Sequence, residues 1–153
     1  MMRSVMVTLL VSLIMIPIVC VANDPILPNH TLTPGATLQV TKTQVCVKGY
    51  STKVRDVPES EKKQVFTEYH IDWSQHSGYE VDHLISLELG GSNDIKNLWP
   101  QSYTTKPYNA HVKDRLEDRL HSMVCKGQMS LVTAQKSIST NWVRAYLAIA
   151  WGK

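Results

Sequence analysis

The sequence predicts a single domain of the α+β class, in which a short pair of strands is followed by several helices. Residues 79–83, Tyr-Glu-Val-Asp-His, have the aromatic and β-branched character of a strand. Gly90-Gly91 then marks a turn before a second, brief strand at Leu98-Trp99. From Asn109 onward apolar residues recur every four positions, which is typical of an amphipathic helix. A chain of 153 residues has the ordinary size of one domain.

The first 22 residues have the pattern of a secretory signal peptide. Arg3 is their one charge, an apolar run covers residues 5–21, and the small residue Ala22 follows. A retained membrane anchor is less favoured because the run is near the lower limit for a spanning helix and Pro17 interrupts it. Lipidation at Cys20 ranks lower still. We expect cleavage after Ala22, a periplasmic or secreted protein, and no stable membrane association afterwards.

Cysteine usage agrees with export. Removal of the signal peptide leaves Cys46 and Cys125, and an even pair in an exported protein predicts a disulfide. That bond would close a loop of about 80 residues and stabilise the fold by about 4–5 kcal/mol in the chain-entropy model. Neither cysteine has a Cys or His partner at zinc-finger spacing, so a structural zinc site is disfavoured.

Irregular structure and one strand are expected before the first long helix. Residues 23–37 contain three prolines and a glycine, which predicts an irregular N-terminal arm. Residues 38–47 are rich in Val and Thr and predict a strand. Residues 58–69 begin with a proline and two glutamates and predict a helix. The domain proper is assigned to residues 38–153.

Helices are expected to fill the C-terminal part. The helix from Asn109 ends at Cys125, where Gly127 can cap it. Ser130 is placed to cap a further helix that reaches Ile138, and a last helical stretch covers residues 142–149. The formal net charge of +3 becomes +2 when the signal peptide is removed, which is compatible with a polyanionic partner without demonstrating one.

A cluster of chemically capable residues spans residues 79–113. Asp82 and His83 place a hard metal ligand beside a titratable base at a strand end. Asn97 follows a glycine-rich loop, and Asn109 opens a helix. Adjacent residues of a regular strand point to opposite faces, so Asp82 and His83 can serve one site only where the strand ends or bulges.

The pattern D-H-L-I…L-G-G-S-N-D…N-L-W-P-Q…N-A-H-V-K resembles the HNH endonuclease motif D-H-I-x-P…G-G…N-L…(H/N)-x-x-K. It covers about a quarter of the chain, and its order and spacing are fairly specific. The flanks C-V-K-G-Y-S and V-K-D-R-L-E…V-C are similar to those of small exported bacterial HNH proteins. The chain departs from the motif at Ser86, where the family usually has proline, and in a longer segment between Asn97 and the helix.

The resemblance implies a ββα-metal (HNH) core with additional helices, and it assigns roles. His83 resembles the general base that activates water, and Asp82 a metal ligand. Asn97 matches the residue that holds the loop so that the histidine is aimed.

The third motif position remains open between two residues. Asn109 is preferred, and His111 is the alternative, about 200° around the helix from it. Asn109 is chosen because it shares a helix face with Lys113, which the resemblance suggests as a ligand of the substrate phosphate.

The function expected from this reading is an exported endonuclease that hydrolyses phosphodiester bonds of DNA, and also RNA as a second candidate, with low sequence specificity. The cofactor would be one divalent cation, with Mg²⁺ preferred over Mn²⁺, Ni²⁺ or Zn²⁺. An immunity or inhibitor protein is a conceivable partner that the sequence does not demonstrate. The alternatives are an exported nucleic-acid-binding module with an inactive HNH site and a purely structural domain.

Overall fold

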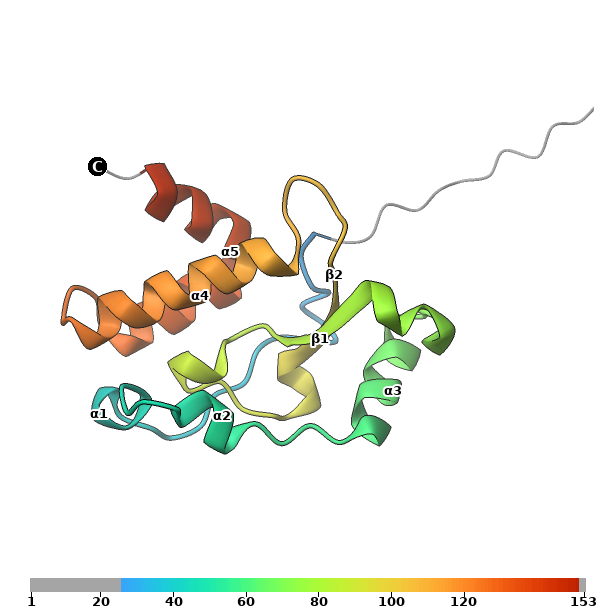
Figure 1. Ribbon diagram of the computed structural model, residues 1–153, viewed down its shortest axis with the longest axis horizontal. Coiled ribbons are helices and arrows are strands. Elements are labelled where there is room, and N and C mark those ends of the chain that lie inside the picture. Colours follow the sequence, from blue (N-terminus) through green and yellow to red (C-terminus); the bar gives the residue numbers. More distant parts are fainter. Residues whose placement is uncertain (1–25, 152–153) are drawn as a thin grey trace, which may run out of the picture.

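Two antiparallel strands lie at the centre of the molecule (Figure 1). In this computed structural model, which describes residues 26–151, β1 (Tyr79–His83) pairs with β2 (Leu98–Ser102) along its whole length. The register runs from Tyr79 opposite Ser102 to His83 opposite Leu98. The signal peptide expected over residues 1–22 lies outside the described residues.

Helices surround this pair of strands, which confirms the α+β class. They are α1 (Lys42–Val45), α2 (Tyr50–Val54), α3 (Glu59–Glu68), α4 (Ala110–Cys125) and α5 (Leu131–Trp151). In Figure 1, α4 and α5 lie side by side on one side of the strands, and α3 lies on the other. Short 3-10 helices occur at Trp73–Gly78, Leu87–Leu89 and Ile95–Asn97. The chain order β1, β2, α4 is therefore strand, strand, helix.

The prediction of a strand over residues 38–47 is wrong, because this segment contains the helix α1. The Thr41 hydroxyl accepts the Gln44 N–H, and the Gln44 side chain accepts the Thr41 N–H at 2.8 Å. This capping box starts a helical turn that outweighs the strand preference of the Val and Thr residues. Val45, at the end of the turn, is buried.

The expected helix from Asn109 is confirmed, and it forms much of the core. Asn109 is the N-cap of α4, and its Oδ1 accepts the Val112 N–H at 3.2 Å. At the other end Gly127 has φ +74° and follows the C-cap, as a glycine-terminated helix requires. The apolar face of α4 packs on α5 and on the strands, in a core that contains Leu84, Leu89, Trp99, Val112, Leu116, Leu120, Val124, Ala134, Ile138 and Trp142.

Helix α5 contains the two helical stretches expected at the C-terminal end. Asn141 has non-helical backbone angles, φ −167° and ψ 96°, and divides α5. Its Oδ1 accepts the Arg144 N–H at 2.8 Å and so caps the second stretch. The Ser130 hydroxyl caps the first stretch by accepting the Thr133 N–H at 3.0 Å.

The N-terminal arm has little regular structure over its described residues 26–37, and it is bonded to the rest of the domain. The buried Thr33 hydroxyl donates to the Leu98 carbonyl at 2.8 Å, and Gly35 N–H donates to the Lys96 carbonyl at 2.9 Å. Nε1 of Trp142 donates to the Ile26 carbonyl at 2.9 Å. The arm therefore stabilises β2 and α5 and does not act as a linker.

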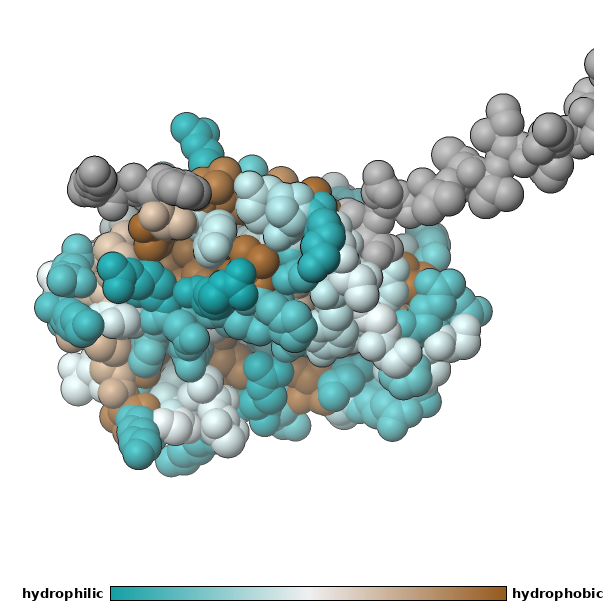
Figure 2. Space-filling model, turned by 45° about the horizontal axis from the view of Figure 1, so that its top comes forward, coloured by the Kyte–Doolittle hydropathy of each residue, from teal (hydrophilic) through white to brown (hydrophobic). Residues whose placement is uncertain are grey.

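Hydrophilic side chains cover most of the face shown in Figure 2, and hydrophobic side chains appear there as separate patches. Scattered apolar residues of this kind are usual on a protein surface. Among residues 26–151, no helix has both the length and the apolar character needed to cross a membrane.

Candidate active site

Asn97 holds together the loop that joins β1 to β2. Its buried side chain accepts the Ile85 N–H at 2.9 Å and donates to the carbonyls of Ile85 and Ser92 at 3.0 and 2.8 Å. A Cβ on Gly91 would come within 1.7 Å of the Ile85 carbonyl oxygen and 2.9 Å of Asn97 Nδ2. Glycine is therefore required at position 91, because any side chain there would collide with the Ile85 carbonyl. Asn97 is a positioning residue for the loop, since its side chain bonds to backbone.

His83 is the last residue of β1, and the pairing with β2 is regular up to it. Asp82 and His83 therefore leave the end of the strand on opposite faces. His83 is 1% exposed, and its Nε2 lies 3.0 Å from Oδ1 of Asn93. Nδ2 of Asn93 in turn donates to the Val54 carbonyl at 2.7 Å.

Those two bonds decide which nitrogen of His83 carries the proton. Because Asn93 Nδ2 is the donor to Val54, Asn93 presents its oxygen to Nε2, which must then be the protonated nitrogen. Nδ1 is left as the acceptor, and it finds no hydrogen-bond partner among residues 26–151. Burial lowers the pKa of His83 below its usual 6.5, so the imidazole is neutral at neutral pH. Sequence reasoning missed Asn93, although it lies in the same glycine-rich loop.

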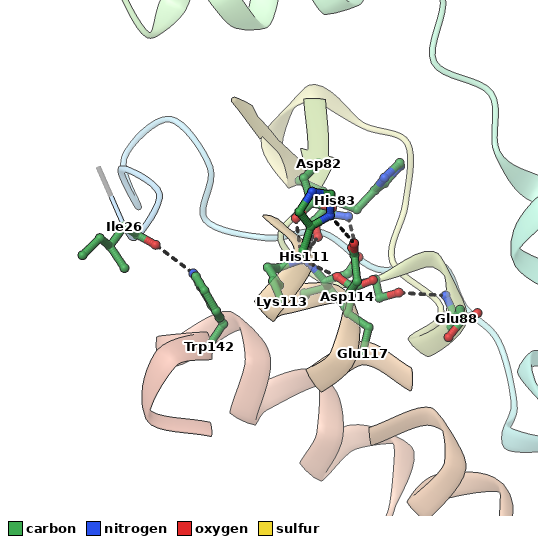
Figure 3. Close-up of polar contacts among 12 residues, drawn as sticks. Ile26, Asp82, His83, Glu88, His111, Lys113, Asp114, Glu117 and Trp142 are labelled. Atoms are coloured by element: carbon green, nitrogen blue, oxygen red, sulfur yellow. Dashed lines mark hydrogen bonds and ion pairs between the residues drawn. The ribbon is translucent and has the colours of Figure 1, made fainter. Parts of the chain in front are cut away.

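Lys113 is not available to a substrate phosphate, and the structure corrects that expectation. Its side chain is fully buried, and Nζ donates to Asp82 Oδ2 and to the His83 carbonyl, each at 2.7 Å. It also forms an ion pair with Glu117, one turn further along α4. Figure 3 shows Lys113 among these partners, between β1 and α4. Lys113 thus fixes α4 against the strand that carries Asp82 and His83.

The charges of this group balance. Burial alone would lower the pKa of Lys113, but Asp82 and Glu117 raise it overall, so the ammonium stays charged. Burial raises the pKa of Glu117, while Lys113 lowers it. One buried cation needs only one carboxylate to neutralise it. The group is therefore closest to neutrality with a proton on Glu117, whose pKa is raised to about 8.

Two further carboxylates near Asp82 lie outside the recognised motif positions. Burial, with repulsion from Asp82 and Asp114, raises the pKa of Glu80 to about 7. Burial and then the charge of Asp82 also raise the pKa of Asp114. Glu80 is two residues before Asp82 and so shares its face of β1, and this spacing could have indicated it. Asp114, on the exposed side of α4, has no comparable signal in the sequence.

The two candidates for the third motif position differ in burial and in contacts. Asn109 is 9% exposed, caps α4, and donates from Nδ2 to the Tyr103 carbonyl at 3.1 Å. His111 is exposed, stacks on the Tyr103 ring at 5.3 Å, and has Nδ1 3.8 Å from Asp114. Both lie at the start of α4.

Cys46 and Cys125 form the expected disulfide, with their Cα atoms 5.7 Å apart. His121 lies beside it, with Nε2 3.3 Å from Cys125 Sγ and 3.0 Å from the Val45 carbonyl. Within residues 26–151, these two cysteines and His121 form a cluster of three residues of types that commonly bind metal ions. Their potential ligand atoms all lie within 4.8 Å of one another. The four-residue spacing of His121 and Cys125 on a helix could have indicated this cluster. In the disulfide the sulfurs are not thiolates, which are the form that binds zinc.

Comparison of the chain with protein-family models, with curated proteins and with solved structures gives no match.

Proposed function

We propose that the chain is an exported, metal-dependent endonuclease of the HNH type, acting on DNA and on RNA as a second substrate. The ββα-metal core would consist of β1, β2 and α4. The observation that supports this best is His83, a buried neutral imidazole with Nε2 held by Asn93 and Nδ1 without a partner among the described residues. An unpaired buried acceptor is unfavourable by about 1–3 kcal/mol, so such an atom calls for a functional explanation.

In the proposed reaction, His83 Nδ1 accepts a proton from a water molecule whose oxygen bonds to phosphorus. The bond from phosphorus to the 3′ oxygen breaks, and that oxygen takes a proton from solvent. The products would carry 5′-phosphate and 3′-hydroxyl ends, as the resemblance implies. Asn93 keeps the proton off Nδ1, and Asn97 holds the loop backbone that follows the base.

The acidic residues beside His83 fit a hard divalent cation. Asp82 can offer its second carboxylate oxygen, since Lys113 holds Oδ2. Burial, and after it the charge of Asp82, raises the pKa of both Glu80 and Asp114, and a cation would relieve this repulsion. Mg²⁺ needs few protein ligands because water and phosphate oxygens complete its shell. When bound, it would stabilise charge on the phosphate and the departing oxygen.

The two residues considered for the third ligand stay alternatives in this proposal. Asn109 is the better candidate because its oxygen lies at the buried start of α4, on the same helix face as Lys113. His111 remains the alternative through its proximity to Asp114.

Plasmid cleavage by the oxidised protein tests the proposal. We expect cleavage with Mg²⁺, loss of cleavage with EDTA, and loss with His83→Ala. His30→Ala is the matched control, because His30 is an exposed histidine outside the site. Failure of the folded protein to cleave DNA or RNA with Mg²⁺, Mn²⁺, Ni²⁺ or Zn²⁺ would overturn the enzyme and favour the inactive nucleic-acid-binding module.

A further inference from the structure

A cleft of about 530 Å³ lies next to the candidate active site. Its walls come from the segment after α2, from α3, from the 3-10 helix at Trp73–Gly78, from β1 and from the end of β2. Glu80 in its lining is two residues from Asp82. A pocket of this size accommodates a small organic group such as a nucleoside, and it is too narrow for a double helix.

The lining combines cations with aromatic rings. Arg55 and Lys62 provide positive charge, Asp56 and Glu80 provide carboxyl groups, and Trp73 and Tyr103 provide rings. Trp73 already has His76 stacked on it at 4.7 Å and the Lys63 ammonium 5.5 Å from its ring centre. Of these two rings, Tyr103, supported by His111 at 5.3 Å, is therefore the one offered to a ligand. Basic side chains interleaved with supported aromatic rings are the usual arrangement for holding single-stranded nucleic acid.

The cleft is connected to the candidate base by hydrogen bonds. Arg55 directly follows Val54, whose carbonyl accepts from Asn93, and Asn93 in turn holds His83 Nε2. A phosphate held by Arg55 would therefore adjoin the phosphate that His83 attacks.

From these observations we infer that the cleft binds one unstacked nucleotide of a single strand, with its base on Tyr103 and its phosphate on Arg55 and Lys62. The inference rests on the proposed function for the class of ligand. It adds that the enzyme prefers single-stranded or frayed nucleic acid to an intact duplex, because a paired base cannot enter the cleft.

Binding without cleavage tests this inference. The oxidised His83→Ala protein in EDTA is titrated into a labelled mixed-sequence DNA strand and into a hairpin duplex of equal length, and fluorescence anisotropy is measured. We expect the single strand to bind at least about tenfold more tightly. Tyr103→Ala should weaken single-strand binding about 5- to 100-fold, whereas Tyr103→Phe should retain it.

Charge is tested with a matched pair of arginines. Arg55→Ala should weaken binding and reduce its salt dependence, whereas Arg144→Ala, an exposed arginine on α5, should not. Equal affinity for strand and duplex, or equal effects of the two arginine variants, would overturn the cleft assignment. A ribonucleotide strand of the same sequence shows whether the cleft distinguishes RNA from DNA.

The outcomes separate this inference from the proposed function. Plasmid cleavage with no preference for single strands would overturn the cleft assignment and leave the nuclease in place. Preference for single strands that depends on Tyr103, in a protein that cleaves nothing, would support the cleft and overturn the enzyme.

Discussion

Nζ of Lys113 lies 2.7 Å from Oδ2 of Asp82, although 31 positions separate the two residues in the sequence. The contact joins α4 to β1 and brings a fully buried ammonium next to the Asp82-His83 pair. Lys113 therefore has a structural role, whereas most lysines face solvent.

Lys113→Met should destabilise the protein strongly, because it leaves buried carboxylates without their cation. Loss of one partner of a buried ion pair costs about 3–5 kcal/mol. Chemical denaturation measures the change, with exposed Lys126→Met as the control. A change below about 1 kcal/mol in the single variant would show that the ion pair matters little.

The raised pKa of Glu80 predicts that its carboxyl group makes folding less favourable as pH rises. The pKa of Glu80 is about 7 in the folded protein, whereas its usual value of 4.5 applies to the unfolded chain. Between pH 4.5 and about pH 7, therefore, the folded chain keeps the proton and the unfolded chain loses it. This contribution to stability is present at low pH and is lost as pH rises from about 4.5 to about 7. The shift corresponds to about 3 kcal/mol, which screening at this partly exposed group reduces to about 1 kcal/mol.

Glu80→Gln should therefore raise the free energy of unfolding by about 1 kcal/mol above neutral pH and leave it unchanged near pH 4. Denaturation across this pH range, in EDTA, is the measurement, and Glu68→Gln on α3 is the control. Equal stability of Glu80→Gln and the parent protein at every pH would contradict the assignment.

Gly91→Ala should disrupt the loop between the strands, since its Cβ would lie 1.7 Å from the Ile85 carbonyl oxygen. We expect a fall of several °C in melting temperature and loss of the hydrogen bonds made by Asn97. Gly78→Ala is the matched control, because a Cβ there meets nothing within 4 Å. Similar melting temperatures for both variants would show that the loop can shift at little cost.

Removal of the disulfide by Cys46→Ser with Cys125→Ser should lower stability by up to about 4–5 kcal/mol, because the bond spans 79 positions. Denaturation of the double variant, compared with the oxidised and the reduced parent, measures the effect. The double variant and the reduced parent should agree. An unchanged midpoint in both would mean that packing alone fixes α1 against α4.

The hydrogen bond from His83 to Asn93 predicts the pH dependence of the proposed cleavage. Because burial lowers the pKa of His83, cleavage should be fully developed at neutral pH and should fall only in acid, as the base becomes protonated. Asn93→Asp places a carboxylate beside Nε2, raises the pKa of His83, and should move the acid limb to higher pH. Thermal melting of this variant separates altered titration from loss of fold. An unmoved acid limb would exclude His83 as the titrating base.

Local patterns in the sequence predicted most elements around the site. The strand at 79–83, the second strand from Leu98 and the capped helix from Asn109 all occur, because alternation, four-residue spacing and N-caps act over a few residues. The Cys46–Cys125 pairing was also predicted, since these are the two cysteines outside the expected signal peptide. The strand predicted over residues 38–47 was wrong, because the Thr41–Gln44 capping box outweighed the strand preference of the Val and Thr residues.

The sequence by itself determined the order of elements, the disulfide and the Asp-His motif, since these depend on neighbouring residues or on residue counts. Only the tertiary structure decided that Lys113 is buried against Asp82, that Asn93 holds His83, and that Glu80 lines a cleft. These facts depend on which distant side chains meet and on which of them water can reach. Desolvation and charge pairing act through space, so spacing along the chain does not reveal them.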